Sequence, residues 1–239
     1  MLRFVRKQHS SLDNRKEMIK VKDIGRFRRL RLKFYKAASK QNWDICREVL
    51  GEITRLKLNK HEKVSESAFN QVFKDNKSKP LFLAAEHGSS VPLDIVERLL
   101  KLNPNAAMCK EPITSRYPLH VFVLNGAKLE VTKAVADAHT SALSALDQVM
   151  NRTPLHIACA SPLTMPSVVD FLCNAGLFAV GIEDLEGNLP MEVLIKYGDT
   201  SDIYSYNIMM EILHKYGAQY WSRKRQSQEL FRITRPDIF

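Results

Sequence analysis

A phrase of proline followed by apolar residues recurs along this chain at a near-constant spacing, and it constrains the fold more than any other feature. The phrases begin at Pro80, Pro118, Pro154 and Pro190, so the intervals between them are 38, 36 and 36 residues. Self-similarity with a period of this length is typical of stacked supersecondary units, each of which contacts mainly its neighbours. The spacing therefore predicts an array of repeated units.

The copy at residues 152–160 shows most clearly how a unit begins. It reads Arg-Thr-Pro-Leu-His-Ile-Ala-Cys-Ala. The hydroxyl of Thr153 can cap free backbone N–H groups, and Pro154 then occupies the first helical position, where a missing N–H costs nothing. The small residues Ala158, Cys159 and Ala160 allow a neighbouring helix to approach closely. We expect a packing helix here.

Thr-Pro-Leu-His-x-Ala is also the phrase that opens an ankyrin repeat, so residues 32–217 resemble the ankyrin-repeat family. The resemblance implies an all-α fold, an ankyrin-repeat solenoid of about five helix-turn-helix repeats. The expected repeats are 32–58, 79–115, 117–151, 153–188 and 189–217. The first of them lacks the opening phrase but keeps an Ala-Ala pair at Ala37 and Ala38. We expect residues 1–31 to form a basic N-terminal arm or capping helix and residues 218–239 a C-terminal tail or cap.

Periodicity and turn residues set the expected helices within the repeats. Inner helices are expected at 80–87 and 118–124, and outer helices at 93–102, 129–138 and about 204–216, the last ending at Gly217. Gly88 and Gly126 stand at the turns between helices, where a positive φ is expected. Asn151 precedes a repeat opening, and we expect a positive φ there also. The polar insertion 59–79 is either a binding loop or a turn of helix over the stack.

No catalytic motif is visible in the sequence, so we expect no catalytic residue, no cofactor and no small-molecule substrate. His156 and Cys159, three residues apart, could suggest a metal pair, but no further ligand stands at the right spacing. In ankyrin repeats this histidine is a structural residue that links the turns of adjacent repeats, and the resemblance implies that role for His156 and His120. The carboxylates of Glu183, Asp184 and Glu186 lie in a turn and are expected to form a solvated tip or a partner contact.

Charge is distributed unevenly along the chain. The net charge is +10, and residues 1–40 hold fourteen Lys and Arg against three Asp and Glu. Residues 80–220 are mildly acidic. The basic excess allows an alternative function, in which the arm associates with nucleic acid or an anionic membrane surface. Its contact residues would be Arg26, Arg28, Arg29, Arg31 and Lys33. The simpler interpretation is that Phe27, Leu30 and Phe34 dock a capping helix onto the first repeat.

A stack of repeats presents an extended surface for recognition, so the main prediction is a non-catalytic scaffold or adaptor that binds another protein. By resemblance, the contacts lie on turn residues before the opening proline and on exposed positions of the inner helix. The matching residues are Glu86, His87, Thr114, Ser115, Arg116, Leu124, Asn125, Met150, Arg152, Glu186 and Asn188.

The expected location is the cytoplasm or the nucleus. No run approaches the ~20 apolar residues that span a bilayer. The amphipathic start of the chain could also serve as a mitochondrial presequence, which the early Asp13 and Glu17 disfavour.

Overall fold

The computed structural model describes residues 25–58 and 80–234. Its contacts divide the chain into two units, Met1–Leu83 and Ala84–Phe239, which are described separately below. The described residues contain helices and turns and no strands, so the predicted all-α fold is confirmed. The predicted insertion at 59–79 and the first 24 residues lie outside the described part of the chain.

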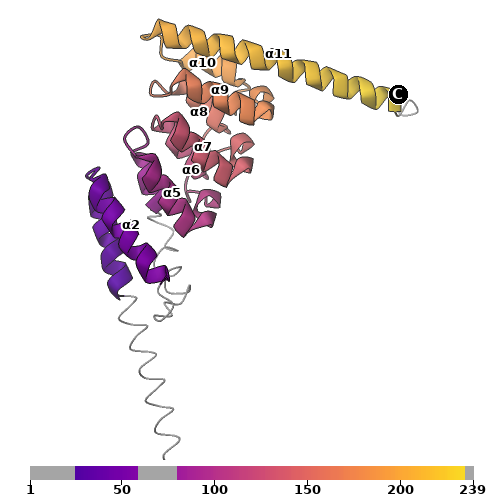
Figure 1. The fold of residues 1–239 in the computed structure, drawn as a ribbon. Helices are drawn as coiled ribbons and strands as arrows, with labels where there is room; N and C mark the ends of the chain where they lie inside the picture. Colours follow the sequence, from indigo (N-terminus) through magenta and orange to yellow (C-terminus); the bar gives the residue numbers. More distant parts are fainter. Residues whose placement is uncertain (1–24, 59–79, 235–239) are drawn as a thin grey trace, which may run out of the picture. The chain divides into compact units, whose positions relative to one another are not determined.

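In the first unit, a helix at 25–38 lies beside α2 (Trp43–Leu58), as Figure 1 shows. Phe27, Leu30 and Phe34 are buried along the first helix, as their spacing predicted. Arg26 pairs with Glu52 and Lys33 with Glu48, each at 2.9 Å. Whether a first repeat begins at residue 32, after a capping helix, stays a prediction, but the helix does not break at that boundary. The apolar positions on both sides of it share one face, and one continuous helix spans it.

The second unit stacks two layers of helices. The helices after α4 (Pro80–Glu86) are α5 (Leu93–Leu102), α6 (Pro118–Leu124), α7 (Leu129–Ala138), α8 (Pro154–Ala160), α9 (Pro166–Ala175), α10 (Pro190–Tyr197) and α11 (Ile203–Thr234). In the inner layer α6 contacts α8 and α8 contacts α10, whereas α5, α7, α9 and α11 follow one another in the outer layer (Figure 1). Short 3-10 helices follow three outer helices, at η1 (Pro104–Met108), η2 (Thr140–Ser144) and η3 (Leu177–Gly181).

The repeated proline fixes where each inner helix begins. Pro118, Pro154 and Pro190 each stand at the start of a helix, after a residue with extended backbone. At the second of these starts the backbone N–H of His156 donates to the hydroxyl of Thr153 at 3.4 Å. The predicted helices at 93–102, 118–124 and 129–138 match α5, α6 and α7. Local start and stop signals therefore suffice for the middle of the stack.

The two turn glycines act in different ways. Gly126 has the expected positive φ of 67°. The expectation of a positive φ at Gly88 is wrong, since Gly126 and Gly187 are the positive-φ glycines of the described residues. Gly88 is required for close approach instead, because a Cβ there would lie 2.9 Å from the carbonyl oxygens of Phe122 and Asn125. The absence of a side chain lets the turn after α4 rest directly on the end of α6.

The C-terminal helix differs most from the prediction. Gly217 does not end it, and α11 continues as one helix of 32 residues to Thr234. A glycine within a helix costs about 1 kcal/mol relative to alanine. Good helix formers such as Ala218 and Gln219 follow it, and the next proline is Pro236. A tail that folds back over residues 218–234 is therefore excluded. In the described part of the chain, no helix combines the length and the apolar composition needed to cross a membrane.

Candidate functional site

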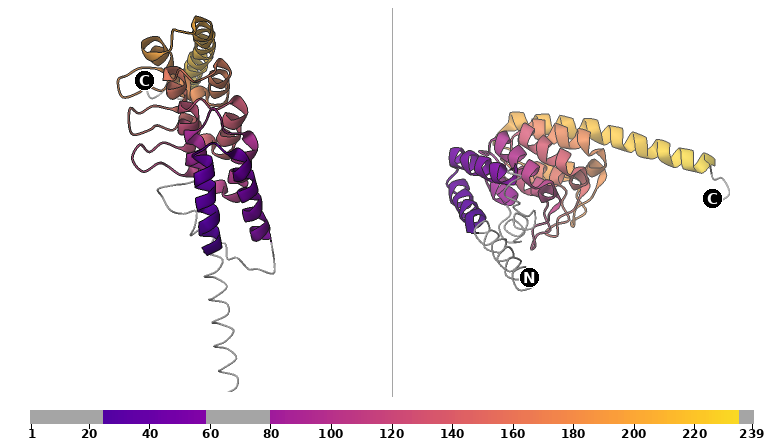
Figure 2. Two further views of the ribbon diagram at one scale, coloured as in Figure 1. Left: turned by 90° about the vertical axis from the view of Figure 1, so that its left-hand side faces the viewer. Right: turned by 60° about the horizontal axis from the view of Figure 1, so that its bottom comes forward.

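Three loops project from one side of the second unit, each leading into an inner helix (Figure 2, left). We name them finger 1 (109–117), finger 2 (145–153) and finger 3 (182–189). The backbone N–H of Gln148 donates to the carbonyl of Thr114, and that of Leu185 to the carbonyl of Met150, both at 2.8 Å. These bonds join each finger to the next. The fingers therefore form one connected surface.

Each finger closes in the same way. The N–H of one acidic residue in each finger (Glu111, Asp147 and Asp184) donates to a carbonyl four or five residues later, as between Asp147 and Arg152 at 3.0 Å. The chain then turns through a residue with positive φ, and three residues at 36-residue spacing take this role: Ser115 (54°), Asn151 (52°) and Gly187 (78°). The positive φ predicted at Asn151 is confirmed. The backbone conformation of the turn therefore recurs with the same 36-residue period as the opening prolines.

Ser115 is the least suited of these residues to a positive φ. An L-residue with a Cβ is disfavoured there by roughly 1–2 kcal/mol, and serine lacks the tolerance of asparagine. We expect Ser115→Gly to raise the free energy of unfolding by up to about 1 kcal/mol, measured by urea denaturation. Asn151→Gly is the matched control and should gain less. An unchanged or lower stability of Ser115→Gly would show that its turn carries no strain.

A ladder of buried ion pairs crosses the fingers. Arg116 of finger 1 donates through Nε to Asp147 of finger 2 at 2.9 Å, and Arg152 of finger 2 donates to Asp184 of finger 3 at 3.1 Å. Both aspartate side chains are fully buried. At the next 36-residue step the sequence has Asn188 in place of arginine, and it hydrogen-bonds Asp184 of its own finger. Each arginine thus fixes the finger that follows it.

Each buried aspartate also holds its own finger closed. Asp147 accepts the backbone N–H groups of Met150 and Arg152 through Oδ1, both at 3.1 Å. Burial alone would raise the pKa of Asp147, but these two N–H groups and the Arg116 guanidinium outweigh it and lower that pKa. The pKa of Asp184 is lowered against its burial by the same combination of backbone donors and Arg152. Both groups are therefore ionised at neutral pH.

Two buried histidines connect the inner helices to the fingers. Nδ1 of His156 accepts the N–H of Thr153 at 3.2 Å, and Nε2 lies 3.2 Å from the carbonyl of Asn188 in finger 3. His120 makes the equivalent contacts with Tyr117 and with the carbonyl of Ala145. Because Nδ1 accepts a hydrogen bond and Nε2 faces a carbonyl oxygen, each ring is neutral and carries its proton on Nε2. These bonds place each histidine in the linking role that the resemblance implied.

Burial is the main reason that these rings stay neutral. It lowers the pKa of His120 to about 4, although the carbonyl of Ala145 and the charge of Asp147 act in the opposite direction. The pKa of His156 is lowered for the same main reason. Cys159 on the same helix is completely buried, and burial raises its thiol pKa. Both ring nitrogens of His156 therefore have hydrogen-bond partners, and the Cys159 thiol is protonated at neutral pH.

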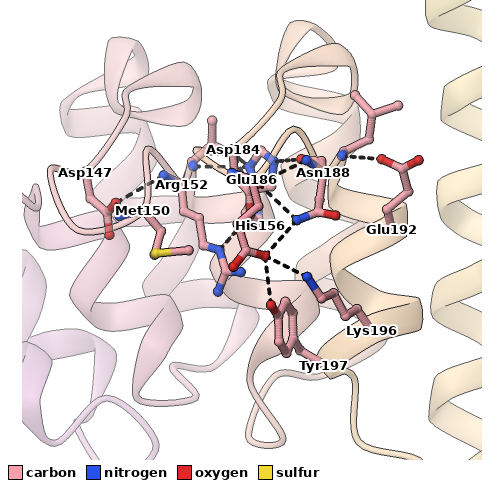
Figure 3. A network of polar contacts seen from close by, with 12 residues as sticks. Asp147, Met150, Arg152, His156, Asp184, Glu186, Asn188, Glu192, Lys196 and Tyr197 are labelled. Atoms are coloured by element: carbon pink, nitrogen blue, oxygen red, sulfur yellow. Dashed lines mark hydrogen bonds and ion pairs between the residues drawn. The ribbon is translucent and has the colours of Figure 1, made fainter.

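The expected solvated tip of carboxylates in finger 3 is wrong for Asp184. Its side chain is buried because it closes the finger, whereas Glu183 and Glu186 are exposed. Figure 3 shows the network that follows from this. Glu186 accepts from Lys196 Nζ and from Tyr197 Oη of α10, both at 2.8 Å. The polar network thus joins finger 3 to the inner helix that follows it.

The structure places the predicted partner-binding residues in two groups. One group has structural contacts of its own: Thr114, Ser115, Arg116, Asn125, Arg152, Glu186 and Asn188. The other group lies at helix ends and finger tips with partial or full exposure: Glu86, His87, Leu124 and Met150, of which His87 and Met150 also make contacts of their own. Exposed Leu124 at the end of α6 is the most apolar of this group. Whether these residues contact a partner stays a prediction.

An apolar ridge on the fingers was not predicted from the sequence. Ile113, Val149 and Leu185 follow one another at intervals of 36 residues, one on each finger. Their exposed fractions are 84%, 47% and 65%. We call these three residues the finger ridge. The same period that identified the prolines could have located them, because the ridge stands five residues before each opening proline.

The geometry defines a class of protein, the helical repeat solenoids whose loops form a continuous lateral surface. Residues 81–184 match the family model described as ankyrin repeats, in three copies. That segment is therefore built of ankyrin repeats, as the opening phrase indicated. No curated protein matches the sequence significantly. Ankyrin repeats are generally modules for protein–protein interaction and are typically not enzymes.

Proposed function

We propose that this chain is a non-catalytic scaffold or adaptor that binds a partner protein on its three fingers and the adjoining ends of the inner helices. The finger ridge is the observation that carries the proposal. Three large apolar side chains stand at one repeated position, exposed to solvent. Scattered apolar residues on a surface are ordinary, but a contiguous exposed patch marks an interaction site.

The rest of the site supports binding by a rigid surface. Backbone hydrogen bonds, two buried Arg–Asp pairs and two buried histidines hold the fingers in register. A surface that is ordered before it binds loses little conformational entropy on binding. Leu124 on α6 and Ile195 on α10 are further exposed apolar side chains, on the inner helices. Glu186, held by Lys196, adds a fixed negative group at one end.

The proposal predicts that the ridge is required for partner capture. The triple variant Ile113→Ser, Val149→Ser, Leu185→Ser removes apolar area without touching the ion-pair ladder. We expect it to retain the fold by circular dichroism and to lose at least about tenfold in recovery of a partner from nuclease-treated lysate at high salt. Each apolar side chain that a partner buries contributes ~1–2 kcal/mol to the binding free energy, so the loss of three supports a reduction of at least this size.

A matched control removes equally exposed apolar groups elsewhere in the second unit. The variant Met108→Ser, Ile203→Ser, Tyr204→Ser alters η1 and the start of α11, where these side chains are 53%, 61% and 74% exposed. It should capture the partner as the unmodified chain does. Equal losses in both triple variants would contradict binding at the ridge.

The alternative function, association of the basic arm with nucleic acid or an anionic membrane, rests on a smaller set of residues than the sequence indicated. Arg26 and Lys33 are engaged by Glu52 and Glu48, whereas Arg28 and Arg29 are exposed on the same helix. Charge reversal at Arg28 and Arg29 tests this alternative. Under it, binding would fall steeply with salt and with the reversal, and the ridge variant would bind normally.

A further inference from the structure

A second concave surface lies between η3 and the middle of α11. It is a pocket of about 550 Å³, lined by Leu177, Phe178, Tyr220, Arg223, Lys224 and Ser227. α11 contacts both η3 and α9, which fixes the two walls relative to each other. None of the lining residues belongs to a finger or an inner helix. The proposed function of the fingers therefore makes no use of this pocket.

The two aromatic residues that line the pocket differ in burial: Tyr220 packs against a glycine, whereas Phe178 is exposed to solvent. Tyr220 packs against Gly181 of η3, where a Cβ would come within 2.1 Å of the tyrosine ring. Glycine is thus the residue that lets the ring form one wall. Phe178, which also lines the pocket, is 78% exposed, although it is a large aromatic side chain. An exposed phenylalanine at the mouth of an apolar pocket gains favourable energy when a ligand covers it.

The rim of the pocket is positively charged. Arg223 and Lys224 line it, and residues 218–227 include no Asp or Glu. Nζ of Lys224 lies 4.7 Å from the ring centroid of Trp221 and 5.8 Å from that of Tyr220. The lysine is therefore held over the aromatic surface next to the pocket. A ligand in this pocket would therefore contact apolar side chains and the two cations Arg223 and Lys224.

We propose that this pocket docks an acidic segment of a partner protein, which inserts one large apolar side chain between Phe178 and Tyr220 and sets its carboxylates against Arg223 and Lys224. The volume accommodates one large anchor side chain and the neighbouring peptide. A buried aromatic or aliphatic anchor with a charged surround is the usual composition of an energetically important contact. The second surface would allow the chain to hold two partners at once.

The observations favour a peptide over a nucleic acid. Nucleic-acid binding draws its affinity from many phosphate contacts, typically about 6–10 for a specific protein. The pocket presents two cations at its rim, and its walls are apolar and recessed. A single anchor flanked by carboxylates fits this arrangement, whereas an extended polyanion would leave the apolar walls unused.

The test uses the full chain and three fluorescein-labelled probes in anisotropy titrations. The first probe is a short peptide of Glu and Gly with one central Trp, the second replaces that Trp with Gly, and the third is a short oligo(dT). We expect the Trp peptide to bind at least about tenfold more tightly than either other probe. Phe178→Ala should weaken it about tenfold, and Arg223→Glu with Lys224→Glu should abolish it.

Two matched variants separate this proposal from non-specific charge and from the fingers. Arg225→Glu changes the same charge on the same helix but not the pocket lining, and the ridge triple variant leaves α11 intact. Both should bind the Trp peptide within twofold of the unmodified chain. Equal binding of the two peptides, equal losses with Arg225→Glu, or tighter binding of oligo(dT) would each overturn the proposal, the last in favour of a nucleic-acid site.

Discussion

Asp147→Ala should lower the free energy of unfolding of the repeat stack by about 3 kcal/mol. The substitution leaves the guanidinium of Arg116 without its partner and removes the acceptor of the N–H groups of Met150 and Arg152. Removing one member of a buried ion pair typically costs ~3–5 kcal/mol, because an uncompensated buried charge remains. Arg116 is one-fifth exposed, so we place the effect at the lower end of that range. Urea denaturation followed by circular dichroism measures it.

Two controls define what the aspartate contributes. Asp147→Asn keeps an acceptor oxygen for the backbone but loses the charge, so it should cost less than Asp147→Ala. Glu183→Ala removes an exposed carboxylate of finger 3 and should change stability by less than about 0.5 kcal/mol. If Asp147→Ala behaves like Glu183→Ala, the ladder does not hold the fingers together.

Acidification from pH 6.5 to pH 4 should destabilise the stack through its buried histidines. In the unfolded chain His120 takes up a proton near its ordinary pKa of 6.5, whereas in the folded chain it does so only near 4. The unfolded state therefore binds more protons between these values, and stability falls as the pH is lowered through this window. With about 1.4 kcal/mol per pH unit, His120 alone contributes a loss of about 3 kcal/mol between pH 6.5 and pH 4. His156 adds to the loss in the same direction.

The pH dependence can be assigned by substitution. His120→Gln removes the titrating ring while keeping polar atoms near Tyr117 and Ala145, so its stability should be lower at pH 7 but should vary less between pH 7 and pH 4. His214→Gln, on an exposed position of α11, should keep the full slope. Further loss below about pH 3.8 is expected from Asp147 and Asp184, whose pKa values are lowered in the folded state. A flat profile from pH 7 to pH 4 would show that the buried histidines are not linked to folding.

The middle of the stack could be predicted from the sequence because its signals are local. A proline at the first helical position, an apolar period of 3.6 and an asparagine or glycine at the turn act within a few residues of one another. They located α5, α6 and α7 and the positive φ of Asn151. The linking role of His156 came from the family phrase, and the structure supplies its partner, the carbonyl of Asn188.

The two ends could not be predicted in the same way, because the competing preferences there are weak. Gly217 looked like a stop, but an isolated glycine costs too little to end a helix whose next residues favour it. At the other end, the helix at 25–38 runs through the expected boundary because Phe27, Leu30 and Phe34 share one face across it. Short-range sequence signals therefore predict that a helix is present more reliably than they predict the residue at which it ends.

The sequence located the turns that form the fingers, but it did not reveal the contacts of their side chains, and partner binding by these residues stays a prediction. Arg116, Arg152 and Asn188 were correctly placed on the turns, but their side chains serve first to connect the fingers. Their partners Asp147 and Asp184 lie 31 and 32 residues away in sequence, so no local pattern pairs them. A comparison of equivalent positions at 36-residue spacing would have found both the ladder and the finger ridge.

Site-specific photocrosslinking on the full chain tests the central claim, that the fingers are the partner-binding surface. A benzophenone amino acid placed at Val149, on the finger ridge, should crosslink the captured partner at high salt. The same group placed at the exposed Glu130 of the outer helix α7 should not. Crosslinking from position 130 with none from position 149 would contradict the account.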